Sequence, residues 1–338
     1  RLDADLARVS RELIGRNDLA RVVKVDGGLS DRHNNGRSVF IVSFENGTRA
    51  LYKPKDLRLD VAWYDLIARL NGSAPPLTLR AARALAREGY GWTEFIEHTG
   101  CADESGCDMY FRRAGAWLAL FHCFAATDMH QENVIAAGDH PVPIDLETIL
   151  QPPPAPPKAE EAESAAFEAA SRMIADSVMA VGVLPAYGRA PDTSIFAMGA
   201  LTADWNSKVK IAWLDVNTDG MRPARAKVLD NANPNLPHIG GRYAYFREHA
   251  DDFLAGFEDY ARFLSRLSRG ADLGGLFDGF AGAPVRKVVR PTRFYSMLLQ
   301  RLKTHRSMDD GAMWSAQADF IARLSDWQAP SDPTWAFH

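Results

Sequence analysis

The sequence lacks several features that would place it in familiar classes. It has only three cysteines, Cys101, Cys107 and Cys123, and an odd number at these spacings does not suit a disulfide scaffold. We therefore expect free thiols and a cytoplasmic location. No apolar run reaches the length of about 18 residues that a membrane helix needs. No signal-peptide pattern opens the chain, which begins with Arg1.

A large excess of charge of one sign is also missing. The chain has 338 residues, a net charge of −4 and a pI near 6.2. This balance argues against a broad surface for nucleic acid or anionic membrane. The Walker A pattern GxxxxGK[ST] does not occur, which disfavours a P-loop enzyme. The composition, 46% hydrophobic and 24% charged, indicates a globular protein with one large domain or two lobes.

The N-terminal third is predicted to form a small sheet with helices. Apolar residues alternate at 21–25, 38–44 and 49–53, which indicates strands. The turn ENGT joins the last two strands and predicts a hairpin that ends at Lys53. The other elements expected in this part are helices at 4–20 and 60–71 and a strand at 90–98.

The rest of the chain is predicted to be mainly helical. The apolar stretch 109–127 indicates a long buried helix. A Pro-rich, acidic loop is expected at 151–163 and irregular structure at 205–241. Further helices are expected at 163–181, 244–269, 293–303 and 312–326. Strands followed by helices predict an α+β fold of two lobes, a small β-rich N-lobe at 1–100 and a larger, mainly helical C-lobe at 101–338.

A stretch rich in carboxylates and histidines, TDMHQENVIAAGDHPVPIDLE at 127–147, follows the long helix. Asp128 and Asn133 have the Asp-x-x-x-x-Asn spacing of a kinase catalytic loop, in which the Asp handles the attacking hydroxyl and the Asn holds magnesium. Asp145 follows a short apolar strand, where a kinase places its second magnesium carboxylate. Lys53, at the end of a hairpin strand, is suited to clamping a nucleotide phosphate. Their order favours a phosphotransferase that uses ATP and Mg²⁺.

Each of these residues also has an ordinary structural interpretation. A surface aspartate, a capping asparagine and an exposed lysine are common, and the spacing recurs by chance. A histidine metal cluster that includes His33 is disfavoured, because His130 is expected in a loop, His140 in a turn and His122 in a helix core.

The lysine of an active kinase needs an acidic partner. The candidates for Lys53 are Asp31, Asp60 and Asp65, and the sequence does not choose among them.

Five longer stretches of the chain follow one another in a recognisable order. They are DRHNNGRSVFIVSFENGTRALYKPKDL (31–57), YGWTEFIEH (90–98), TDMHQENVIAAGDHPVPIDLETIL (127–150), WLDVNTDGM (213–221) and RKVVRPTRFY (286–295). Together they resemble the dehydratase domain of class II lanthipeptide synthetases, the LanM type. The resemblance extends over roughly residues 22–325.

The resemblance implies a lipid-kinase-like fold and a two-step reaction. Such domains phosphorylate Ser and Thr of a ribosomally made precursor peptide with ATP and magnesium. They then eliminate phosphate to give dehydroalanine or dehydrobutyrine. The implied partner is the precursor peptide, with a leader and a Ser/Thr-rich core. The sequence carries no Cys…Cys-His zinc constellation of a cyclase domain, so a separate cyclase or biosynthetic protein is expected as a further partner.

The resemblance also assigns roles to residues near the nucleotide. Asp31 and His33 match an Asp-x-His pair near the phosphate loop, although Ser30 stands where the family usually has Gly. Lys53 matches the lysine that contacts the phosphates of ATP. Asp128 and His130 match the catalytic loop.

The remaining matches concern metal binding and phosphate elimination. Asn133, Asp145 and Glu147 match the metal-binding residues, with Asn133 and Asp145 also next to the nucleotide. Arg286 and Thr292 match the pair associated with phosphate elimination. A leaving phosphate dianion needs positive charge and hydrogen-bond donors, which a guanidinium and a hydroxyl supply.

Two alternatives to the dehydratase remain open. One is a kinase-like phosphotransferase without the elimination step. The other is a subunit that binds nucleotide or peptide without catalysis; intact Lys53, Asp128, Asn133 and Asp145 count against it.

Overall fold

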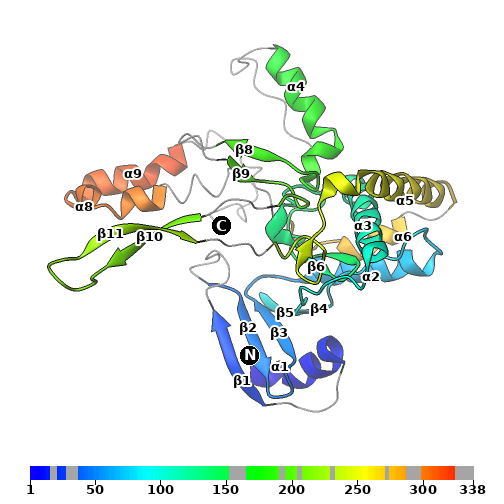
Figure 1. Cartoon of the computed structure of the whole chain (residues 1–338), viewed down its shortest axis with the longest axis horizontal. Helices are drawn as coiled ribbons and strands as arrows, with labels where there is room; N and C mark the ends of the chain where they lie inside the picture. Colours follow the sequence, from blue (N-terminus) through cyan, green and yellow to red (C-terminus); the bar gives the residue numbers. More distant parts are fainter. Residues whose placement is uncertain are drawn as a thin grey trace. The chain divides into compact units, whose positions relative to one another are not determined.

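The computed structural model of the chain contains two compact units. They consist of Arg1–Asp31 with Ser38–Arg286, the large unit, and Arg32–Arg37 with Lys287–His338, the small unit (Figure 1). The structure describes residues 1–15, 21–27, 37–151, 165–189, 195–203, 208–228, 233–270, 274–286 and 298–323.

The large unit begins with a helix that packs on a five-stranded antiparallel sheet. Helix α1 (Leu2–Arg8) continues as a π-helix at Val9–Ile14 and ends at Gly15, whose φ is 75°. The predicted helix at 4–20 is therefore too long, because the left-handed glycine ends it. The sheet has the order β1-β2-β3-β5-β4. Its strands are β1 (Val22–Gly27), β2 (Phe40–Phe44), β3 (Arg49–Lys53), β4 (Ala84–Arg87) and β5 (Tyr90–Glu94).

A small apolar core lies between the N-terminal helix and this sheet. Its buried members are Val9, Leu13, Val42, Phe44, Ala50, Leu85 and Trp92. Asp5 is buried at its edge, where its carboxylate accepts hydrogen bonds from Arg87 Nε (2.7 Å), Tyr90 Oη (2.8 Å) and Trp92 Nε1 (3.0 Å). These donors satisfy the buried charge and fix the helix on strands β4 and β5.

The predicted hairpin of β2 and β3 is confirmed and ends at Lys53. Beyond β3 the chain crosses the sheet, and Leu57 packs against Gly91 of β5. A Cβ at Gly91 would lie only 2.5 Å from the Leu57 side chain, so this close approach needs a glycine. The crossing leads directly into α2 (Arg58–Gly72). Strand β4 was not anticipated, and the predicted strand at 90–98 ends at Glu94.

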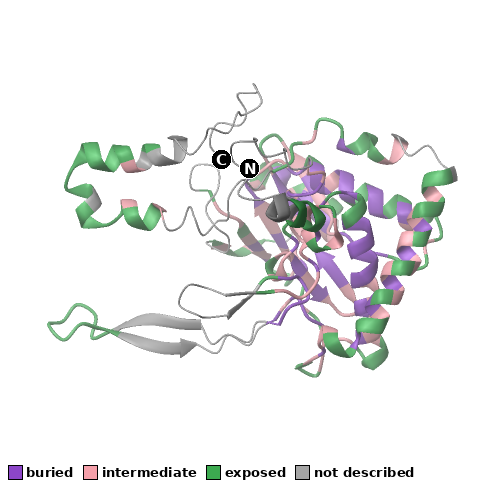
Figure 2. Ribbon diagram, turned by 90° about the horizontal axis from the view of Figure 1, so that it is seen from above, coloured by how far each residue is buried: buried purple, intermediate pink, exposed green. Residues whose placement is uncertain are grey.

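The rest of the large unit is mostly helical and contains the larger core, which appears in Figure 2 as the buried residues of its helices. Its other helices are α3 (Glu104–Cys123), α4 (Ala165–Ala175), α5 (Ala250–Gly270) and the short α6 (Gly274–Phe277). Helices α3 and α5 cross in close contact. A Cβ at Gly115 would lie 1.9 Å from the Phe253 carbonyl oxygen, and one at Gly256 would lie 1.9 Å from the Arg112 carbonyl oxygen. Two glycines therefore permit this crossing.

The predicted buried helix is confirmed as α3, but its bounds differ from those predicted at 109–127. It begins at Glu104 because Asp103 caps it, with the carboxylate accepting the Gly106 N–H at 3.1 Å. It ends at Cys123, and Ala125 then adopts a left-handed φ of 45°. The helix therefore stops before the carboxylate-rich stretch, which forms a loop.

Among the described residues, four two-stranded hairpins complete the large unit. They are β6–β7 (Val134–Ala137, His140–Pro143), β8–β9 (Tyr187–Arg189, Ile195–Ala197), β10–β11 (Lys208–Leu214, Arg222–Val228) and β12–β13 (His238–Ile239, Arg242–Tyr243). Short 3₁₀ turns lie at Gln131–Asn133, Val178–Val181, Phe246–Glu248 and Asp278–Phe280. The prediction of irregular structure at 205–241 is wrong, since the β10–β11 hairpin and strand β12 fall within it. Helices α4 and α5 are shorter than predicted, with α5 beginning at Ala250 after a 3₁₀ turn.

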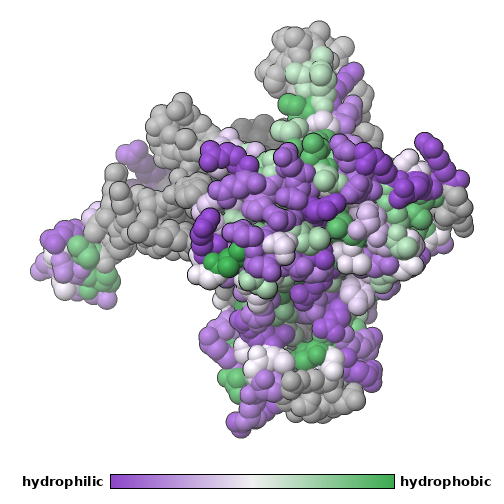
Figure 3. Space-filling view, turned by 45° about the vertical axis from the view of Figure 1, so that its right-hand side comes forward, coloured by the Kyte–Doolittle hydropathy of each residue, from purple (hydrophilic) through white to green (hydrophobic). Residues whose placement is uncertain are grey.

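The described part of the small unit is helical. It has a helix at 298–302, α8 (His305–Met308) and α9 (Gly311–Arg323), and Trp314 Nε1 donates to the Leu302 carbonyl at 3.1 Å. Within the ranges that the structure describes, no helix is long and apolar enough to span a membrane. Figure 3 shows mainly hydrophilic side chains on the face it presents, with hydrophobic ones scattered among them. The chain is thus a mixed α/β protein with a small N-terminal sheet and a mostly helical remainder.

Candidate active site

The loop after α3 places Asp128 in an unusual backbone conformation. Its φ is 62°, in the left-handed region that aspartate tolerates better than most residues. The Met129 N–H donates to the Val181 carbonyl at 2.9 Å, and Asn133 Nδ2 donates to the Asp128 carbonyl at 2.8 Å. These two bonds fix both polar groups of the peptide unit that joins Asp128 to Met129. Burial raises the pKa of Asp128, and the nearby His130 and Arg286 charges oppose that shift.

His130 has a local structural contact in the same loop. Its Nδ1 accepts the Glu132 N–H at 3.3 Å and so caps the 3₁₀ turn that carries Asn133. This capping contact alone accounts for a histidine at this position, without a catalytic role. A catalytic role for His130 stays a prediction.

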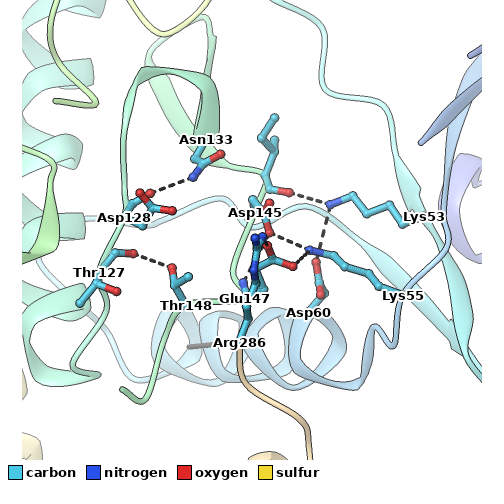
Figure 4. Close-up of polar contacts among 11 residues, drawn as sticks. Lys53, Lys55, Asp60, Thr127, Asp128, Asn133, Asp145, Glu147, Thr148 and Arg286 are labelled. Atoms are coloured by element: carbon cyan, nitrogen blue, oxygen red, sulfur yellow. Dashed lines mark hydrogen bonds and ion pairs between the residues drawn. The ribbon is translucent and has the colours of Figure 1, made fainter. Parts of the chain in front are cut away.

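Two carboxylates follow the β6–β7 hairpin, and a lysine lies between them. Lys55 Nζ donates to Asp145 Oδ1 and to Glu147 Oε2, each at 2.8 Å (Figure 4). Burial acts to raise the pKa of Asp145, but the Lys55 and Lys53 charges lower it to about 2. Burial acts to lower the pKa of Lys55, and the two carboxylates more than reverse this and raise it. Asp145 and Lys55 are therefore both charged at neutral pH.

Lys53 is buried and held by different partners. Its Nζ donates to the Ile144 carbonyl at 2.7 Å and lies 3.9 Å from Asp60 Oδ1, on α2. Burial raises the pKa of Asp60, although the Lys53 and Lys55 charges oppose the shift. Of the acids considered as partners of Lys53, Asp60 lies beside it and Asp65 is exposed on α2, whereas Asp31 lies outside the described residues.

Arg286 joins this cluster from the far end of the large unit. Its guanidinium donates to Glu147 Oε1, and its backbone N–H donates to the Glu147 carbonyl at 2.6 Å. Gln151 Nε2 donates to the Arg286 carbonyl at 2.7 Å. Burial acts to lower the pKa of Arg286, but the Glu147 charge raises it overall. The arginine is thus fixed beside the carboxylates.

Residues 1–337 match the family described as Domain of unknown function (DUF4135). The chain belongs to this family. It is also similar to the Lacticin 481/lactococcin biosynthesis protein LcnDR2 of Lactococcus lactis subsp. lactis, with 24% identity over 311 residues. That match covers 88% of this chain and 32% of the relative, so the chain spans about a third of the relative's length.

The structure of this DUF4135 chain brings together most of the residues that the sequence singled out. They are Lys53, Asp128, Asn133, Asp145, Glu147 and Arg286, with Lys53 on one side of the cluster and the Asp128–Asn133 loop on the other (Figure 4). Asp31, His33 and Thr292 lie outside the described residues.

Lys55 is the site residue that the sequence interpretation missed. It lies two residues beyond Lys53, in a bend that follows β3. Its closeness in sequence to Lys53 was the available signal. The resemblance had matched only the first of the two lysines.

The oxygen atoms of the cluster fit a magnesium ion. Asp145 and Glu147 offer carboxylate oxygens and Asn133 an amide oxygen, which are the hard ligands that Mg²⁺ prefers. The Asn133 amide nitrogen is used to hold the loop, so its oxygen is the atom with metal-binding chemistry. The DUF4135 chain therefore has a suitable donor set for the predicted metal.

Two features elsewhere in the large unit are separate from this cluster. Ligand atoms of Asp108, His249 and Asp252 lie within 4.8 Å of one another where α3 meets α5, and His249 Nδ1 pairs with Asp108 at 2.9 Å. A shallow hollow of about 500 Å³ is lined by Asp56, Arg58 and residues 86–89. Neither contains a residue of the cluster around Asp145.

Proposed function

We propose that the chain is a peptide-modifying enzyme of lanthipeptide biosynthesis that phosphorylates Ser and Thr of a precursor peptide with ATP and then eliminates the phosphate. The observation that carries the proposal is the gathering of four side chains around the Asp145–Glu147 carboxylate pair. They are Lys53, Asp128, Asn133 and Arg286 (Figure 4). The similarity to a protein named for lacticin 481 biosynthesis supports a peptide as the substrate.

The first step would be a kinase reaction, in a kinase-like fold with an N-lobe at 1–100 and a C-lobe at 101–338. Asp128 would accept the proton of the substrate hydroxyl as it attacks the γ-phosphate of ATP. Asn133, Asp145 and Glu147 would hold Mg²⁺, whose positive charge offsets the charge of the phosphates. Lys53, fixed by the Ile144 carbonyl and Asp60, would contact the phosphates from the sheet side.

The second step would be elimination. A base takes the α-proton of the phosphorylated residue, the Cα–Cβ double bond forms, and the Cβ–O bond breaks to release phosphate. Arg286, which contacts Glu147 in the same cluster, would bind the departing phosphate through its guanidinium. Thr292 would supply a further donor. The product is dehydroalanine from Ser and dehydrobutyrine from Thr.

Mass spectrometry of a Ser/Thr-rich precursor peptide, encoded near the gene, tests both steps. With ATP and Mg²⁺ we expect a loss of one water per modified residue. Lys53→Ala and Asp128→Ala should abolish all modification, whereas Arg286→Ala should accumulate peptide that has gained phosphoryl groups. Lys24→Ala, an exposed lysine of β1, is the control and should behave as the wild type. An unmodified peptide in the wild-type reaction would refute the proposal.

A kinase without elimination is the second candidate. The observation that favours it is that the Arg286 guanidinium already pairs with Glu147, so its role could be to hold that carboxylate. This candidate predicts a stable phosphopeptide as the wild-type product. A non-catalytic binding subunit predicts heat on ATP titration with no change in peptide mass. In either case a precursor peptide and a separate cyclase are the proposed partners, and the cytoplasm is the proposed location.

A further inference from the structure

Lys55 occupies the position between the two carboxylates that would hold a metal ion. Its Nζ is 2.8 Å from Asp145 Oδ1 and 2.8 Å from Glu147 Oε2. The side chain is only 24% exposed, so water screens these contacts weakly. The ammonium therefore offsets one of the two formal negative charges of the pair and reduces the repulsion between the carboxylates.

A magnesium ion cannot ligate the same two oxygens while Lys55 is there. Magnesium binds oxygen at about 2.0–2.1 Å, so an ion shared by both oxygens would overlap the ammonium nitrogen. The two positive charges would also repel each other at such a short distance. Binding of the ion between these oxygens requires Lys55 to leave.

The surroundings allow Lys55 to leave without disturbing the carboxylates. Arg286 holds the other oxygen of Glu147 and also its backbone carbonyl. Asp145 Oδ1 also accepts the Glu147 N–H, at 3.5 Å. The lysine itself has a flexible four-carbon stem whose ammonium can rotate to new acceptors. The movable group of the cluster is therefore the lysine.

Lys53 has a different attachment, although it lies only two residues away. Its Nζ is held by the Ile144 carbonyl at 2.7 Å and by Asp60, and neither is one of the metal-binding oxygens. It contributes positive charge to the same cluster without occupying the space between Asp145 and Glu147. This difference provides a matched control.

We propose that Lys55 is a built-in counter-ion of the Asp145–Glu147 pair that competes with a divalent cation and leaves when the cation binds. The proposal rests on the proposed function only in assigning these carboxylates to the metal. It makes Lys55 a residue that sets the affinity for magnesium and holds the empty pair in place.

Metal affinity of the full chain without nucleotide or peptide tests the proposal. The probe is Mn²⁺, which shares the preference of Mg²⁺ for oxygen ligands and whose free form is counted by EPR. If the pair is free of Lys55 in about a tenth of molecules, the apparent affinity is weakened about tenfold. Lys55→Met should then lower the Mn²⁺ dissociation constant about tenfold, and Mg²⁺ should displace the bound Mn²⁺.

Lys53→Met separates competition from a general change in charge. It removes the same charge from the cluster, so a field effect would tighten Mn²⁺ binding in this variant as well, although less strongly because Lys53 does not contact the pair. We expect a much smaller change in Lys53→Met and wild-type affinity in Lys55→Arg. Unchanged or weaker binding by Lys55→Met, or equal tightening by Lys53→Met, would overturn the proposal.

Lysine acylation of the wild-type protein gives a test that does not depend on a variant folding. An amine-reactive ester should label Lys55 several-fold faster with saturating Mg²⁺ than without it, while the labelling of Lys53 stays constant. Peptide fragmentation distinguishes the two lysines. Labelling of Lys55 that does not rise with Mg²⁺ would contradict displacement.

The outcomes also separate this proposal from the proposed function, since neither measurement uses ATP or peptide. If Mg²⁺ displaces Lys55 but the precursor peptide stays unmodified, only the proposed dehydratase function is refuted. If the wild type modifies the peptide but the wild type and Lys55→Met bind Mn²⁺ equally well, only the proposed role of Lys55 is refuted.

Discussion

Asp60→Asn is the substitution that most directly tests how Lys53 is positioned. Asp60 is only 7% exposed, and its carboxylate lies 3.9 Å from Lys53 Nζ. Asparagine has nearly the same shape, so the change removes the charge without opening a cavity. Lys53 then keeps the Ile144 carbonyl as its partner.

The expected cost in stability is small because two opposing effects nearly cancel. Two unit charges about 4 Å apart attract by about 4 kcal/mol at an effective dielectric constant of 20. Yet burial raises the pKa of Asp60 despite Lys53 and Lys55, so losing water costs this carboxylate more than it gains from the lysines. We therefore expect the free energy of unfolding at neutral pH to change by less than about 1.5 kcal/mol.

The pH dependence of this difference has a definite sign. A carboxyl whose pKa is raised by folding stabilises the protein fully below its unfolded pKa of about 3.9 and loses that contribution as pH rises through the folded pKa. Wild type therefore loses stability from Asp60 as pH rises, and the variant does not. The stability of Asp60→Asn relative to wild type should increase over the same range.

Urea unfolding at several pH values measures both quantities, with Asp65→Asn on the exposed face of α2 as the control. Phosphorylation should fall by about a hundredfold in Asp60→Asn, because Lys53 loses one of its two positioning contacts. Destabilisation above about 3 kcal/mol would show that the pair is strongly stabilising and would refute the reasoning. A stability of Asp60→Asn relative to wild type that falls as pH rises would also refute it.

Two further predictions concern the loop of Asp128 and the crossing of helices α3 and α5. The pH–rate profile of phosphorylation should have its acid limb above the ordinary aspartate pKa of about 3.9, because burial raises the pKa of Asp128. Asp145, with a pKa of about 2, is already ionised there, and an acid limb below the ordinary value would contradict a role for Asp128 as base. Gly256→Ala should destabilise the protein by about 3 kcal/mol in denaturant unfolding, because its Cβ meets the Arg112 carbonyl. Gly72→Ala, in open space at the end of α2, should change stability by less than about 1 kcal/mol, and equal effects of the two would refute the close crossing.

The N-terminal sheet could be predicted because its signals are local. Alternating apolar residues and the ENGT turn define the β2–β3 hairpin within fifteen residues of Lys53, and no distant contact decides them. The hairpin β10–β11 was missed for a local reason as well. Its first strand, Lys208–Leu214, alternates, but Arg222–Val228 has few apolar residues to match.

The assembly of the site was less predictable because it depends on long-range contacts. Lys55 meets Glu147 across 92 positions, and Arg286 meets it across 139. No spacing rule covers such distances. Only the family resemblance placed Arg286 with the carboxylates, and it gave no partner for Lys55. Asp60 was one of several acids until the packing of α2 selected it.

The three hydrogen bonds that attach Arg286 to Glu147 and Gln151 have a consequence for how a substrate would pass through the enzyme. The arginine proposed for elimination cannot separate from Glu147 and Gln151 without breaking them. A phosphorylated side chain would thus meet the eliminating guanidinium where it received its phosphate. Under the proposed function, the peptide would need no release between the two steps, and little free phosphopeptide would escape into solution.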